Sequence, residues 1–220
     1  MDVLQKILHE KNEAASLPER VYNDLLRDIL TGVLPKNSKL TENRLCAKYK
    51  VSRTPMREAF RRLEMDGLVE YIPNRGEFVR GFTQVEIDDM LMMRADLEVT
   101  ACRWAIERIT DIELEQMSDI FKYMEFYTDK ADIRKMIDIN FAFHLMIYRA
   151  THDTMLEKTL VSYSRYADYC CPVNYFAKKY LERVLAEHRR IYTAFQTKDP
   201  AAGARAMRLH MNNTLRRSGL

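Results

Sequence analysis

The chain has 220 residues, of which 47% are hydrophobic and 30% are charged, a composition typical of folded globular proteins rather than disordered ones. It contains no uninterrupted apolar run of roughly 18 residues and no charged-then-apolar leader, so we expect neither a membrane span nor secretion. Four cysteines show no CxxC pairing, which indicates reduced thiols in the cytoplasm. Because the net charge is only +3, any binding to nucleic acid must come from a local basic patch.

The first third of the chain predicts three short helices and a hairpin. Residues 17–30 carry apolar side chains at spacings of three and four, and Gly32 ends this helix. A second helix is expected from the N-cap Thr41 to Lys48, and a third from the cap Ser52 to about Met65. Two alternating runs, 68–72 and 77–80, are joined by a turn at 73–76 and predict a hairpin. This order of elements is a winged helix-turn-helix, whose third helix is placed to enter a major groove.

The rest of the chain predicts helices only. The expected helices cover 83–108, with Thr83 and Glu86 as a capping box, then residues from Asp111, 133–150, 154–169, 175–196 and 199–215. A second capping box is expected at Thr154 with Glu157, and Cys171-Pro172 is expected to interrupt the chain. The predicted fold is mainly α: an N-terminal winged helix-turn-helix (17–80) plus a C-terminal antiparallel helical bundle (83–217), after a tail of residues 1–16.

The predicted third helix carries the strongest functional pattern. Met56, Ala59, Phe60 and Leu63 form its apolar face, while Arg53, Arg57 and Arg61 follow one another at intervals of four residues along another face. The ordinary interpretation is a solvated face with ion pairs one turn apart. Three arginines near a helix N-terminus, on the last helix before a hairpin, favour DNA instead, because arginine presents a bidentate fork to phosphates and guanine edges. The basic excess of the chain is also concentrated in this first part.

Several segments here resemble the GntR family of bacterial transcription regulators: Leu-Thr-Glu-Asn-Arg-Leu (40–45), Val-Ser-Arg-Thr-Pro-Met-Arg-Glu-Ala-Phe (51–60), Asp-Gly-Leu-Val (66–69) and Asn-Arg-Gly-Glu-Phe-Val (74–79). The resemblance implies that Arg53, Thr54 and Arg57 contact DNA and that the wing tip Arg75-Gly76 reaches the minor groove. Ser52, Arg61 and Asn43 complete the predicted DNA-binding set, although relatives often carry Arg at position 43. Lys36-Asn37 replaces the usual Pro-Gly, and Asn tolerates the left-handed conformation of a turn.

Three histidines, His144, His188 and His210, each fall in the middle of a predicted helix of the second part. Counted from the connection at 197–199, His188 and His210 lie at similar heights on neighbouring antiparallel helices, and Asn140 precedes His144 by one turn. A single histidine in such a position is usually a hydrogen-bonded core residue. Three at matching heights predict a site for a divalent metal such as Zn or Ni, with Asn140 as an oxygen ligand.

The pattern Arg94-Ala-Asp-Leu-Glu98, Asn140-x-x-x-His144, Glu187-His188 and Leu209-His210 resembles the FadR-like branch of this family with its helical effector domain, called FCD. Many members bind a metal through an Asp and three His, with a small carboxylate effector. Here Asn140 stands at the Asp position, and a neutral amide is the poorer ligand. Arg94 is the candidate for the effector carboxylate, or else it forms a salt bridge with Glu98 one turn away.

The predicted protein is a homodimeric regulator, not an enzyme, that binds a double-stranded DNA operator and a small organic acid or sugar acid. We expect a repressor, although nothing in the sequence separates repression from activation. One alternative is a metalloenzyme with a three-His centre, but Glu187 points about 100° away from His188 and no other general base stands near. Another is a winged helix that binds protein, for which binding to DNA would show little salt dependence.

Overall fold

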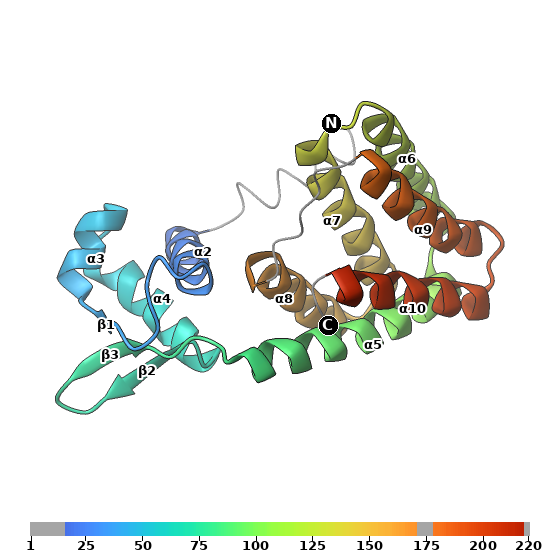
Figure 1. Ribbon diagram of the computed structural model, residues 1–220. Coiled ribbons are helices and arrows are strands. Elements are labelled where there is room, and N and C mark those ends of the chain that lie inside the picture. Colours follow the sequence, from blue (N-terminus) through green and yellow to red (C-terminus); the bar gives the residue numbers. More distant parts are fainter. Residues whose placement is uncertain (1–15, 171–177, 218–220) are drawn as a thin grey trace. The chain divides into compact units, whose positions relative to one another are not determined.

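The computed structural model describes residues 16–170 and 178–217 (Figure 1). These residues divide into two compact units, one up to Ile87 and one from Asp88 onward. Within the described residues no helix is both long and apolar enough to cross a membrane. The cysteines at 46, 102 and 170 carry free thiols.

The first unit has the predicted order of helices and hairpin, and it adds one short strand. Its elements are α2 (Leu17–Leu30), β1 (Lys39–Leu40), α3 (Glu42–Tyr49), α4 (Arg53–Met65), β2 (Val69–Ile72) and β3 (Gly76–Val79). The apolar face predicted for α4 is buried and packs against α2, whose Leu25 and Leu26 are fully buried. Thr41 and Ser52 stand at the N-cap positions of α3 and α4, but neither side chain makes a capping hydrogen bond.

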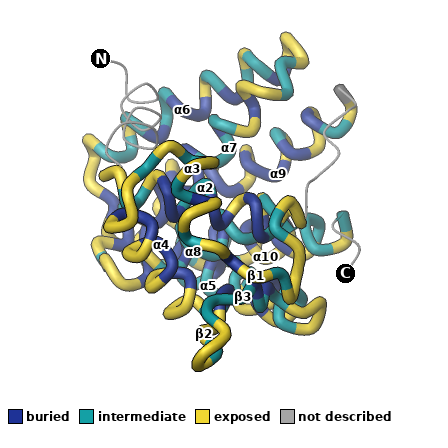
Figure 2. Tube along the Cα trace, turned by 90° about the vertical axis from the view of Figure 1, so that its left-hand side faces the viewer, coloured by how far each residue is buried: buried dark blue, intermediate teal, exposed yellow. Residues whose placement is uncertain are grey.

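The three strands form an antiparallel sheet in the order β1-β3-β2. Ile72 pairs with Gly76, so Gly76 belongs to strand β3 and the turn of the hairpin is one residue shorter than expected. Asn74 and Gly76 have φ values of 62° and 93°, a conformation that Asn and Gly tolerate best. Asn37 has φ 65°, as the turn there requires. The tip of the hairpin is exposed (Figure 2) and forms the wing.

The second unit consists of helices, as predicted. They are α5 (Gln84–Arg108, whose first turn lies in the first unit), α6 (Asp111–Asp129), α7 (Ile133–Ala150), α8 (Thr154–Cys170), α9 (Lys178–Gln196) and α10 (Pro200–Arg217). Helix α6 packs against α7 and α9, α9 packs against α10, and α7 packs against α8. Gly203 of α10 lies close to Cys102 and Ile106 of α5, so this glycine allows the two helices to approach.

The caps predicted for α5 and α10 are present, whereas the cap predicted for α8 is not. The capping box of Thr83 and Glu86 is present, and Asp199 accepts a hydrogen bond from the backbone of Ala202 at the start of α10. The predicted box of Thr154 with Glu157 is wrong, because Asp153 accepts from the first backbone amides of α8. The Glu157 side chain instead accepts from Arg149. The expected interruption at Cys171-Pro172 and the helix start at Tyr175 lie outside the described residues.

Candidate nucleic-acid interface and metal centre

The outer face of α4 presents Arg53 and Arg57 to solvent, with side chains 64% and 66% exposed. Both pair with Glu42 in the first turn of α3. Arg57 Nε lies 2.7 Å from Glu42 Oε2, and Arg53 Nε lies 3.4 Å from Glu42 Oε1. Within the described residues, neither arginine forms an ion pair with an acidic residue one turn away on α4. The ordinary interpretation, a solvent-exposed face whose charges pair along one helix, therefore does not apply to Arg53 and Arg57.

The other predicted DNA-binding residues fall into two places. Ser52, Thr54, Arg61 and Asn43 are exposed on α4 or beside it. Arg75 and Gly76 lie at the tip of the wing, where the Arg75 guanidinium stands 5.2 Å from the centre of the Phe78 ring. At this distance the face of the ring attracts the guanidinium. The structure therefore offers two exposed basic elements, the outer face of α4 and the wing.

The three predicted histidines converge in the second unit. His144 of α7, His188 of α9 and His210 of α10 are buried, and one ligand nitrogen of each lies within 4.8 Å of those of the other two. Their ring centres are 5.4 Å (144 to 188), 5.3 Å (144 to 210) and 4.5 Å (188 to 210) apart. The matching heights that the sequence predicts for these histidines thus agree with the close approach of their rings in the structure.

The Nδ1 atom of each imidazole faces an acceptor. His144 Nδ1 lies 3.0 Å from Glu98 Oε2, His210 Nδ1 lies 2.8 Å from Glu187 Oε2, and His188 Nδ1 lies 2.8 Å from the Val184 carbonyl oxygen. A neutral imidazole that donates from Nδ1 keeps a lone pair on Nε2, which is the arrangement of metal-bound histidines. His188 Nε2 is buried and has no hydrogen-bond partner among the residues that the structure describes.

Burial keeps two of these rings neutral. Desolvation, followed by the neighbouring His210 and His144, lowers the pKa of His188 well below its ordinary value. Burial also lowers the pKa of His210, and its hydrogen bond to Glu187 offsets this only in part. Both rings are therefore in the form that can bind a metal at neutral pH.

Two buried carboxylates, Glu98 and Glu187, contact the Nδ1 atoms of His144 and His210. Burial raises the pKa of Glu98, but His144, Arg94 and Tyr148 outweigh it and hold that pKa at about 2. Burial likewise raises the pKa of Glu187, whose partners His210 and Arg217 bring it down to about 2. Both groups are thus ionised and orient an imidazole, as carboxylates beside metal-bound histidines do.

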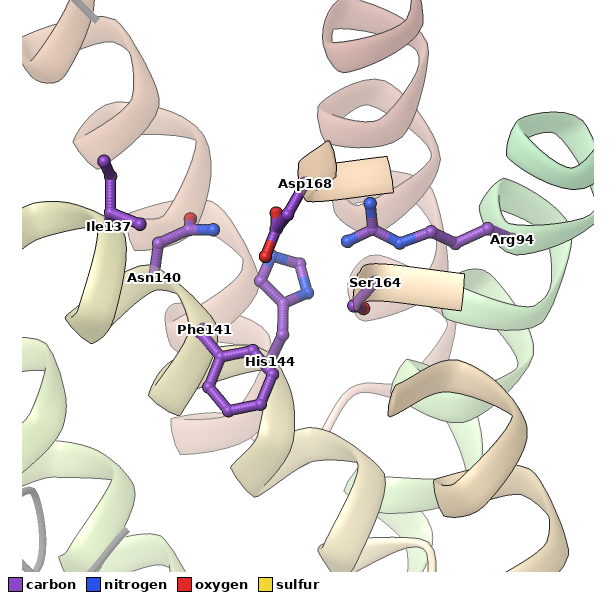
Figure 3. A pocket seen from close by; sticks show the side chains of 7 residues that line it. All are labelled: Arg94, Ile137, Asn140, Phe141, His144, Ser164 and Asp168. Atoms are coloured by element: carbon purple, nitrogen blue, oxygen red, sulfur yellow. The ribbon is translucent and has the colours of Figure 1, made fainter. Parts of the chain in front are cut away.

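A small pocket opens beside His144. It is lined by Arg94, Ile137, Asn140, Phe141, His144, Ser164 and Asp168. Figure 3 shows the Arg94 guanidinium, the Asn140 amide and the Asp168 carboxylate pointing into it from different helices. Arg94 Nη2 lies 3.3 Å from Glu98 Oε1, so the alternative salt bridge predicted for Arg94 exists. Within the described part of the chain, Arg94 Nε is buried and has no hydrogen-bond partner. Arg94 thus lines the pocket and pairs with Glu98 at once.

Sequence reasoning missed the acidic members of these sites. The sequence predicts Glu98 only as a partner of Arg94, whereas the structure also places it against His144. Glu187 points away from His188, as predicted, but it contacts His210 on the next helix. The sequence pattern gives no role to Asp168 or Glu42. A usable signal was present for Glu98, since it lies one turn after Arg94 on a face that is otherwise apolar.

These features define a class of protein. A winged helix-turn-helix with exposed arginines on its third helix is the arrangement of a DNA-binding protein. Residues 17–79 match the family model of the bacterial regulatory proteins of the gntR family, and residues 89–213 match that of the FCD domain. The chain belongs to the GntR family, among the regulators with an FCD domain. It is a DNA-binding transcription regulator and not an enzyme.

Known relatives extend over most of the chain. The HTH-type regulator YdhC of Bacillus subtilis is 28% identical over 87% of this chain and 86% of its own length. The HTH-type transcriptional repressor RspR of Escherichia coli is 23% identical over 91% of this chain and 88% of its own. The solved structure of E. coli McbR/YncC superposes with a TM-score of 0.72 at 21% identity, covering 93% of this chain and 98% of that one. The last similarity supports the fold.

Proposed function

We propose that this regulator is a homodimer that binds a pseudo-palindromic operator, one half-site per subunit, with α4 in the major groove. Arg53, Thr54 and Arg57 would read bases there, flanked by Ser52, Arg61 and Asn43, and Arg75-Gly76 of the wing would enter the adjacent minor groove. The exposure of α4 and of the hairpin tip supports this arrangement. Two-fold symmetry then places the half-sites about one helical turn apart, or a multiple of it.

The helical unit, we infer, binds one divalent ion, zinc or nickel, through the Nε2 atoms of His144, His188 and His210. The observation that carries this proposal is the buried His188 Nε2 without a partner, in a cluster whose Nδ1 atoms all have acceptors. An unsatisfied buried polar atom costs roughly 1–3 kcal/mol, which a ligand bond would offset. The ion would supply a Lewis-acid position that holds an anionic oxygen.

Asn140 fits such a centre only as a weak ligand. It lines the same pocket as His144, one turn earlier on α7. Its amide oxygen is neutral, so three imidazoles and Asn140 leave the charge of the ion uncompensated within the ligand set. An anionic effector would supply the missing charge.

The effector we propose is a small organic acid or sugar acid. Arg94 would bind its carboxylate, because a guanidinium forms two parallel hydrogen bonds with such a group. Asp168, Ser164 and Asn140 line the same pocket and carry oxygen atoms that could accept hydrogen bonds from hydroxyl groups of the effector. Bound effector would favour one arrangement of the DNA-binding units in the dimer and so change operator affinity. We propose repression, the activity in the name of RspR, with release by the effector.

The DNA part is tested by gel shift with the full-length protein and a duplex selected from a random pool. Replacing Arg53 and Arg57 by Ala should weaken binding at least about tenfold, since each good bidentate contact contributes roughly 1–3 kcal/mol. The control is Arg103→Ala, an exposed arginine of the helical unit. Unchanged affinity of the double variant would show that α4 is not the recognition helix.

The metal part is tested by elemental analysis and native mass spectrometry of the purified protein. One ion per chain is expected in the wild type, none in His188→Ala, and one in His152→Ala, which changes an exposed histidine outside the cluster. A second measurement guards against misfolding: wild-type protein stripped with a chelator should gain thermal stability when zinc or nickel is added. If neither ion changes the melting temperature of the stripped protein, the proposed metal site is wrong.

A further inference from the structure

One acidic residue stands between the two helices of the DNA-binding motif. Glu42, in the first turn of α3, has a side chain that is 26% exposed and contacts both Arg53 and Arg57 of α4. Its two carboxylate oxygens are divided between the two arginines, one oxygen each. This geometry fixes the position of the two guanidiniums with respect to each other and with respect to α3.

The atoms used in these contacts leave the reading edges of the arginines open. Each arginine approaches Glu42 through Nε, the nitrogen nearest the side-chain stem. The two terminal Nη nitrogens of each are then available for the paired hydrogen bonds that a guanine edge accepts. A free arginine side chain loses up to about 2 kcal/mol of rotamer entropy when it is fixed, and prior fixation by Glu42 removes part of that cost.

The same carboxylate has the opposite effect on phosphates. A negative charge within the basic surface repels the DNA backbone at any sequence, because non-specific binding is governed by charge alone. Glu42 therefore acts against non-specific binding while it supports base readout.

We propose that Glu42 is a specificity-determining positioning residue that holds Arg53 and Arg57 for base recognition and suppresses non-specific binding to the phosphate backbone. The proposal rests on the assignment of α4 as the recognition helix. The arginine variants described above test that assignment separately. If they bind normally, the assignment fails, whereas the outcome for Glu42 is read only from the ratio of specific to non-specific affinity.

The experiment uses the full-length protein and two duplexes of roughly 20–30 bp, long enough for two half-sites. One is the sequence that the wild type selects from a random pool, and the other is a shuffled version of it. Dissociation constants for both are measured at several salt concentrations. For Glu42→Gln, we expect the ratio of specific to non-specific affinity to fall about tenfold, the cost of losing one well-placed bidentate contact. Part of that fall should come from tighter binding to the shuffled duplex.

Two further variants separate position from charge. Glu42→Asp keeps the charge on a shorter side chain that cannot reach both arginines, so it should lose specificity without gaining non-specific affinity. Glu58→Gln removes an exposed acid of α4 that, among the described residues, forms no ion pair with Arg53 or Arg57, and it should keep the wild-type ratio. An unchanged ratio in Glu42→Gln would overturn the proposal. So would equal losses in Glu42→Gln and Glu58→Gln, which would reveal a pure charge effect.

Discussion

Replacing Glu98 by Gln is the sharpest test of the buried network behind the histidines. The Glu98 side chain is fully buried and accepts hydrogen bonds from His144, Tyr148 and Arg94. Glutamine has the same size, but it presents one acceptor oxygen and one NH₂ group in place of two acceptors. At least one of the three donors then faces another donor, and the buried Arg94 charge loses its partner.

The magnitude follows from that geometry. Removing one partner of a buried ion pair costs roughly 3–5 kcal/mol. The lower end applies here, because the Arg94 side chain is 13% exposed and borders a pocket that also contains Asp168. We therefore expect Glu98→Gln to lower the free energy of unfolding of the metal-free helical unit by about 3 kcal/mol. Affinity for zinc or nickel should fall about 10–100-fold, as for other carboxylates that orient a metal-bound histidine.

The assay can isolate the helical unit, because Trp104 is the single tryptophan of the chain and lies on α5. Urea unfolding followed by its fluorescence, with a chelator present, reports this unit. Glu107→Gln, an exposed change on the same helix, should stay within about 0.5 kcal/mol of the wild type. In an Arg94→Met background Glu98→Gln should cost at least about 1 kcal/mol less, because no buried cation remains to be stranded. A loss below about 1 kcal/mol in Glu98→Gln alone would refute the reasoning.

Three further predictions concern other residues. Asp28→Asn should lower the free energy of unfolding of the winged unit by about 2 kcal/mol at neutral pH, measured by calorimetry, because buried Asp28 accepts hydrogen bonds from Lys48 and Tyr49. The control Asp24→Asn changes a more exposed aspartate and should cost about 0–1 kcal/mol. Burial raises the pKa of Asp28, but those partners outweigh it and bring the pKa below its ordinary value. The cost should therefore be full well above that ordinary value and vanish as the pH falls through the lowered pKa. Gly203→Ala puts a Cβ 2.2 Å from Ile106 Cδ1, so overpacking should outweigh the gain in helix propensity. We expect the free energy of unfolding in urea to fall by about 1 kcal/mol, and the second change Ile106→Val should remove this loss. Asn140→Asp should tighten zinc binding and weaken that of a carboxylate effector, both measurable by titration calorimetry.

The winged unit could be predicted because its signals are local. The spacing of Met56, Ala59, Phe60 and Leu63 defines the buried face of α4, and the turn residues define the hairpin. The strand β1 could not be predicted, since two residues carry no periodicity and the pairing partner Phe78 lies far along the chain. The cap of α8 was misjudged for a related reason. Asp153 and Thr154 are both good caps, and the sequence does not show which one the chain places at the boundary.

The histidine cluster was predictable from helix lengths, because three side chains on neighbouring antiparallel helices meet when their heights match. The acids around it were not. Whether Glu187 serves His188 on its own helix or His210 on the next depends on the rotation of α9 about its axis. The same applies to Glu42, whose contacts with Arg53 and Arg57 depend on how α3 crosses α4. Such pairings arise from tertiary packing, which local periodicity does not encode.

The charges that the described residues place around the three imidazoles give a reason for Asn140. The carboxylates of Glu98, Glu187 and Asp168 and the guanidiniums of Arg94 and Arg217 leave one net negative charge there. A divalent ion would turn this into one net positive charge, which one effector carboxylate would neutralise. An aspartate at position 140 would supply part of that negative charge from the protein itself and weaken the electrostatic preference for an anionic ligand. In the proposed complex the neutral amide would therefore make the ion and the effector carboxylate favour each other's binding, which is the coupling that the proposed response to an organic acid would need.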